Sequence, residues 1–161
     1  MAKIRKIGTA KVKKLPGKIK KISGGKEPVR VIEEFLVRRG FSPDDCLQQR
    51  NSETATWSVP LSDDEELEIT LEGLNRISES TIYMGVNVMS VPIKNIQETL
   101  ISALLIADTL IAAKLSLVNY DLVLSVTQYI SDIGVEEIDY FFEILSRQKD
   151  IIREAIIEGQ D

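Results

Sequence analysis

The chain has 161 residues, with 20 lysines and arginines against 25 aspartates and glutamates, one cysteine and no histidine. A single cysteine excludes an intrachain disulfide, and the lack of histidine excludes Ser–His–Asp and Cys–His nucleophiles and the commonest zinc ligand. We therefore expect a non-enzymatic protein with no catalytic residue, no cofactor, no metal site and no small-molecule substrate. A histidine-free enzyme would need a deep pocket in which carboxylates converge beside a perturbed lysine, and no motif indicates one.

The net charge of −5 is distributed unevenly along the chain. Residues 1–26 contain ten basic residues and no acidic one, which leaves ten basic and 25 acidic residues, a charge of −15, for the remainder. Such a split predicts either two separate functions or association between the two parts. Gly24 and Gly25 indicate a linker, so we divide the chain into a basic tail, residues 1–25, and a folded domain, residues 26–158.

The basic tail repeats one pattern in residues 3–8, 11–17 and 18–24. Each copy reads basic–aliphatic–basic–basic–aliphatic and ends in glycine, which predicts an extended, mobile arm because glycine and proline disfavour a continuous helix. The arm is either a solubilising leader or a binder of anionic partners, namely nucleic acid or an anionic membrane through residues 3–21, or an acidic protein groove. Its regular aliphatic residues favour a protein or membrane surface. The candidate binding residues are Lys11, Lys13, Lys14, Lys18, Lys20 and Lys21.

Neither a secretory signal nor a membrane span is expected. The N-terminal segment lacks the apolar core and cleavage site of a signal peptide, and its scarcity of arginine and serine argues against a transit peptide. The most apolar stretch, residues 100–117, carries Asp108 and Lys114, which disfavour burial in a bilayer. We therefore expect a cytoplasmic protein.

The folded domain is expected to begin with a helix and three strands. Apolar residues at helical spacing over 27–39, followed by Gly40, predict an amphipathic helix. Apolar residues that alternate with polar ones predict strands over 54–61, 67–71 and 81–91. Short turns between them predict an antiparallel meander with one buried face.

A long helix is expected next, over residues 93–113, and it is apolar on nearly all sides. One face, which includes Ala103 and Leu104, is expected to pack on the meander. The flanks then need a second cover, which is either another helix of the chain or a second subunit. We favour a homodimer, and the residues expected at this dimer or partner seam are Ile101, Leu105, Asp108 and Ala112.

The remaining sequence predicts a β-hairpin and a closing helix. Residues 114–117 and 122–129 flank a turn at 118–121, and apolar residues at helical spacing predict a helix over 135–157. The expected fold class is α+β, with two layers, an antiparallel five-stranded sheet and helices packed on it in the order α-β-β-β-α-β-β-α. Cys46 is interpreted as a structural thiol, and the acidic run at residues 63–66 as a solvated turn.

This order of elements, the long apolar central helix, the hairpin of residues 114–126 and the closing amphipathic helix resemble the YbjN family. The resemblance covers residues 27–158 and implies the type III secretion chaperone-like fold, with a curved sheet. Chaperones of that fold pair through central helix and sheet surfaces and hold client segments in extended form. YbjN-type proteins are labelled as regulators of sensory transduction, without an established activity. The basic repeat is not part of the family pattern.

Composition and resemblance together predict a chaperone- or adaptor-like protein that binds a segment of a partner protein, with the basic tail as an auxiliary electrostatic arm. The alternative is a peripheral binder of nucleic acid or anionic membrane in which the tail is the active part. The two are distinguished by salt dependence, which is steep when lysines neutralise phosphates.

Overall fold

A computed structural model describes residues 27–76 and 79–159 of the chain. The basic tail, with all six of its candidate lysines, lies outside the described residues. The six strands are β1 (Leu47–Arg50), β2 (Thr54–Pro60), β3 (Glu66–Glu72), β4 (Thr81–Ser90), β5 (Lys114–Val118) and β6 (Asp121–Tyr129). They form one antiparallel sheet in the order β1-β2-β3-β4-β6-β5.

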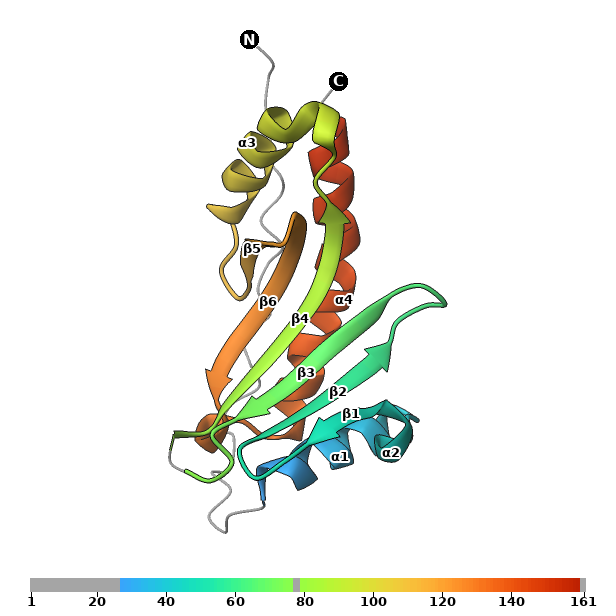
Figure 1. The fold of residues 1–161 in the computed structure, drawn as a ribbon, viewed down its shortest axis with the longest axis vertical. Helices are drawn as coiled ribbons and strands as arrows, with labels where there is room; N and C mark the ends of the chain where they lie inside the picture. Colours follow the sequence, from blue (N-terminus) through green and yellow to red (C-terminus); the bar gives the residue numbers. More distant parts are fainter. Residues whose placement is uncertain (1–26, 77–78, 160–161) are drawn as a thin grey trace.

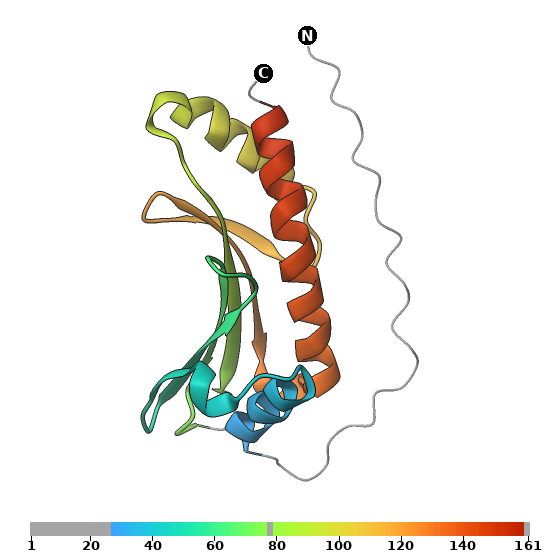
Figure 2. The ribbon, with the colours of Figure 1, turned by 90° about the vertical axis from the view of Figure 1, so that its right-hand side faces the viewer.

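The helices form a second layer on one face of this sheet (Figures 1 and 2). They are α1 (Pro28–Arg38), α2 (Pro43–Cys46), α3 (Ile96–Ala107) and α4 (Val135–Glu158), with single 3-10 turns η2 (Ile93–Asn95) and η3 (Ile130–Asp132). Helix α4 runs along the central strands, and α1 packs beside its first turns. The two-layer α+β class predicted from the sequence is therefore confirmed.

Strand periodicity explains where the core lies. Leu67, Ile69 and Leu71 of β3 are fully buried, because alternate side chains of a strand point to the same face. The pairing register places Trp57, Ile69, Met84 and Val126 side by side on four neighbouring strands. All four are buried under the helices, so the predicted alternation of β2, β3, β4 and β6 is confirmed.

The sheet has six strands, and the predicted number of five was wrong. The missed strand, β1, is short and polar and holds one apolar residue, Leu47, which is half-buried. It pairs with β2 alone and contains a register shift between Leu47 and Gln49. An edge strand of this kind has no buried face of its own, so its sequence carries no alternation to detect.

The central helix is shorter than predicted. Residues 93–113 were expected to form one helix, but α3 ends at Ala107, and Asp108 is its C-cap. The Ile106 carbonyl oxygen accepts hydrogen bonds from the backbone N–H and the hydroxyl of Thr109, at 2.9 and 2.7 Å. These bonds satisfy a carbonyl at the end of the helix and let the chain turn into β5. Ala112 consequently lies after the helix, not on it.

A partly buried ion-pair network, centred on the buried Lys149, fixes α4 to the turn between β2 and β3. The Lys149 ammonium, whose side chain is 6% exposed, donates to Glu65 and, at 2.8 Å, to Asp150. Arg153 bonds Glu65 at 2.6 Å and donates to the Val88 carbonyl oxygen at 2.6 Å. Burial lowers the pKa of Lys149, but the hydrogen bonds to Asp150 and Glu65 outweigh it and raise the pKa overall.

Candidate partner-binding surfaces

Helix α3 exposes a row of large apolar side chains. Ile101, Leu104 and Leu105 are 51%, 70% and 57% exposed, while the opposite face buries Thr99, Ala103 and Ile106. Ile111 in the following loop and Leu117 of β5, a strand that contacts α3, are also exposed. We call these five exposed residues, Ile101, Leu104, Leu105, Ile111 and Leu117, the α3–β5 surface.

The structure brings two of the four predicted seam residues onto this surface. Ile101 and Leu105 lie one helical turn apart on the exposed face, and Asp108 follows them at the helix end, also exposed. Ala112 is exposed but belongs to the loop. Leu104 was expected to face the body of the protein and instead points to solvent. Because apolar residues lie on nearly all sides of α3, the sequence pattern does not predict which side faces the core.

The hairpin turn beside this surface has a strained backbone. Asn119 and Tyr120 have φ angles of 49° and 71°, so both central residues of the turn are left-handed, as the tight twist of a two-residue hairpin requires. Asparagine tolerates this conformation, but tyrosine does not do so readily. The Tyr120 side chain is exposed, and its carbonyl oxygen accepts a hydrogen bond from the Val91 N–H at 2.8 Å. The predicted turn at residues 118–121 is thus confirmed.

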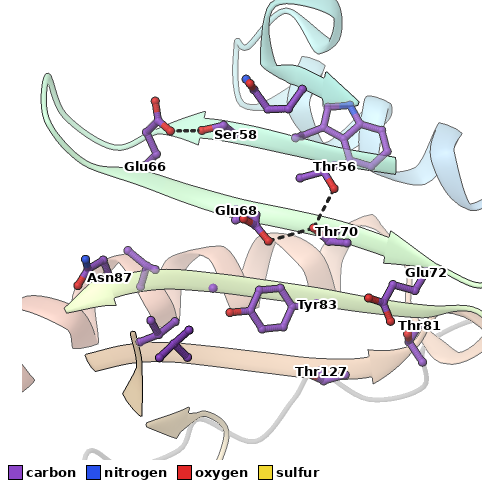
Figure 3. Close-up of a pocket in the computed structure, with 16 residues that line it drawn as sticks. Thr56, Ser58, Glu66, Glu68, Thr70, Glu72, Thr81, Tyr83, Asn87 and Thr127 are labelled. Carbon is purple, nitrogen blue, oxygen red and sulfur yellow. Dashed lines mark hydrogen bonds between the residues drawn. The ribbon is translucent and has the colours of Figure 1, made fainter. Parts of the chain in front are cut away.

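The face of the sheet opposite the helices carries a second surface, an open hollow of about 790 Å³ (Figure 3). Its lining comes from neighbouring strands and is mostly hydroxyls, amides and carboxylates. Thr56 bonds Thr70 at 3.1 Å, and Thr70 donates to Glu68 at 3.1 Å, so the three side chains form a chain of hydrogen bonds across β2 and β3. Ser58 donates to Glu66 on the same pair of strands.

A tyrosine lies flat in the middle of this face. A Cβ atom added at Gly85 would come within 2.3 Å of the Tyr83 hydroxyl oxygen and 2.6 Å of the ring carbon that bears it. Glycine therefore makes room for the ring on the sheet surface. Burial and, to a smaller extent, the nearby Glu68 carboxylate raise the pKa of the Tyr83 phenol, against a hydrogen bond with Ser125.

Three glutamates of β3 give the open face a negative charge. Glu66, Glu68 and Glu72 are exposed and line the hollow, and no lysine or arginine is among its lining residues. None of the three forms an ion pair with another described residue. This surface was not predicted from the sequence, although the alternation that predicted β3 also places all three carboxylates on one side of it.

The other singled-out residues occupy ordinary structural positions. Cys46 is buried at the end of α2, and burial, with a smaller effect of Asp45, raises the pKa of its thiol. Across residues 27–76 and 79–159, no three histidine, cysteine or acidic side chains lie close enough together to hold a metal ion. Within the same ranges, no helix is long and apolar enough to cross a membrane.

Comparison with known proteins identifies the fold but no family. No protein-family model matches the chain, and no curated protein matches it. Among solved structures, a chain of the ExsC–ExsE complex aligns with a TM-score of 0.55 and 14% identity, over 78% of this chain and 90% of that one. A chain of the HopA1–SchA chaperone–effector complex aligns with a TM-score of 0.51 and 16% identity, over 78% and 91%.

These alignments confirm the type III secretion chaperone-like fold that the resemblance implied. At identities of 14% and 16%, the alignments show a shared fold, and functional residues and partners are not transferred from them. Membership of the YbjN family stays a prediction, since no family model supports it.

Proposed function

We propose that this chain is a non-enzymatic, chaperone- or adaptor-like protein that pairs with a second copy through the α3–β5 surface and holds an extended segment of a partner protein. The observation that carries the proposal is the row of Ile101, Leu104 and Leu105, which are more than half exposed on the face of α3 opposite its buried residues. Large apolar residues gathered on one exposed surface are typical of an interaction site.

The exposed row has free energy to gain from a partner. Burying a large aliphatic side chain contributes about 1.5–3 kcal/mol relative to leaving it in water. Exposure of three such side chains to water on one face of α3 is therefore unfavourable, and a partner that covers them recovers that free energy. A second copy is the simplest cover, because two-fold pairing places the same surface against itself.

The fold supports the second half of the proposal. A solved chain that shares it belongs to a chaperone–effector complex. Strands β1 and β5 lie at the two edges of the sheet, and such edges accept an added strand from a partner.

The experiment is site-specific crosslinking in the full-length chain. A photoreactive phenylalanine analogue replaces Leu104 in one variant and Val37, which is 62% exposed on α1, in a matched control. We expect position 104 to give a self-crosslinked dimer and one defined protein adduct, and position 37 to give neither. Equal labelling at both positions, or none at 104, would contradict the proposal.

The same experiment tests the alternative. A variant with glutamine at Lys11, Lys13, Lys14, Lys18, Lys20 and Lys21 keeps the folded domain and removes much of the charge of the tail. We expect its protein adducts at position 104 to persist. If the wild type instead retains nucleic acid or lipid that salt releases and the glutamine variant retains none, the tail carries the function.

A further inference from the structure

We infer that the open face of the sheet is a docking surface for an extended basic segment, and that its occupant is residues 3–22 of the same chain. The inference does not depend on the α3–β5 surface or on the proposed function. It rests on the shape and charge of the open face, on the ion pairing of the domain, and on the position at which the tail joins the domain.

The domain has few unpaired cations that could neutralise this face. Residues 27–161 contain ten basic residues, and eight of them already pair with carboxylates in the described structure. Lys94 and Lys114 are the two that form no ion pair with a described residue. The tail, residues 1–25, carries nine basic residues and has no acidic residue to hold them. The positive tail and the negative open face are therefore complementary in charge, which favours binding of one to the other.

The chemistry of the hollow matches the repeated pattern of the tail. Glu66, Glu68 and Glu72 follow one strand and offer carboxylates to the lysines and the arginine. Val118, Val123 and the Tyr83 ring supply apolar surface in the same hollow for the aliphatic residues that separate the basic ones. A tyrosine face also attracts cations. An entirely acidic face would suit a polylysine, whereas this one suits alternating basic and aliphatic residues.

The tail joins the domain beside β1, the edge of the sheet that is nearer to the glutamates of β3. Glu27, the first described residue, lies 3.5 Å from the Arg50 guanidinium at the end of β1. Across the sheet, Arg50 pairs with Ala55 and Ala55 with Leu71, the neighbour of Glu72. Two strand spacings, about 10 Å, therefore separate the edge from the carboxylate strand. Twenty extended residues span up to about 65 Å, which is enough to round β1 and cross all six strands.

The test uses the full-length chain with a nitroxide spin label at Ala10→Cys. Cys46 is buried with a raised pKa, so the wild-type chain treated with the same reagent controls for its labelling. We expect the label to broaden the amide signals of the strands that bear Thr56, Glu68 and Tyr83, and to leave the outer face of α4 unaffected. High salt should remove the broadening, because exposed ion pairs are screened.

Two matched triple variants test whether docking of the tail depends on the carboxylates of the open face. Glu66→Gln/Glu68→Gln/Glu72→Gln should lower the ratio of docked to free tail by about tenfold, the effect expected for three exposed ion pairs. Glu98→Gln/Glu154→Gln/Glu158→Gln removes the same charge from three exposed carboxylates on α3 and α4 and should leave the broadening unchanged.

Four results would overturn the inference. They are the absence of broadening, broadening centred on α4 or the α3–β5 surface, and equal loss of broadening in both glutamine variants. The fourth is broadening of an isotope-labelled, spin-free chain by a spin-labelled second copy, which would show that the tail binds another molecule.

Discussion

Replacing Leu104 by serine tests the α3–β5 surface at its most exposed helical residue. Full burial of a leucine contributes about 1.5–3 kcal/mol, so a side chain with 70% of its surface still open has about 1–2 kcal/mol to gain from a partner. A two-fold dimer uses the residue twice and loses about 2–4 kcal/mol, which weakens the dimer roughly 30- to 1,000-fold. The fold itself should be unaffected, because Leu104 makes little contact with the core.

The assay is sedimentation velocity of the full-length chain over a series of concentrations. Ile151→Ser is the matched control, since Ile151 is 56% exposed on α4 and is not part of the α3–β5 surface. We expect a concentration-dependent dimer for the wild type and the control, and a monomer over the same range for Leu104→Ser. A wild type that stays monomeric, or a control that weakens the dimer equally, would refute the reasoning.

Three further predictions concern the stability of the domain and the geometry of its open face. Glu65→Gln should lower the free energy of unfolding by about 2 kcal/mol in urea titrations, because it takes a charged partner from the buried Lys149. Tyr120→Gly should raise the same free energy by about 1 kcal/mol, because glycine relieves the positive φ angle. Gly85→Ala should push the Tyr83 ring off the sheet and return the raised pKa of its phenol towards 10, measured by NMR titration with labelled tyrosine.

A specific result would contradict each of these three predictions. The hydrogen bonds to Lys149 and Arg153 lower the pKa of Glu65, so its contribution is present above its unfolded pKa of about 4.3 and is lost as the pH falls through the folded value. The Glu65→Gln deficit should therefore shrink in acid, and a deficit independent of pH would contradict the ion-pair argument. A destabilised Tyr120→Gly would show that the exposed ring packs on its neighbours. An unchanged Tyr83 pKa in Gly85→Ala would show that the ring does not need the space.

The sequence specified the elements whose side chains meet the core at a regular interval. Ile138, Leu145, Ile152 and Ile156 share the helical spacing that predicted the last helix, and all four are buried on α4. The strands β2, β3, β4 and β6 were found for the same reason, with a period of two. In these elements burial falls on one side only, so the apolar pattern by itself records which side faces the core.

Where an element has no one-sided apolar pattern, the sequence does not predict which of its residues are buried. Helix α3 is apolar all round, so its pattern could not decide that Thr99 and Ala103 would be buried and Leu104 exposed. The end of the helix at Ala107 depends on hydrogen bonds made by Thr109, and β1 exists because β2 offers it an unpaired edge.

The sequence by itself determined the α+β class, the one-sided core and the division between a basic tail and an acidic domain, because each is written in local periodicity or composition. Only the tertiary structure decided which apolar residues stay in water and which carboxylates stay without an ion pair. Those depend on which elements remain to cover each face once the sheet and α4 have packed together, and that is a property of the assembled layers rather than of any segment.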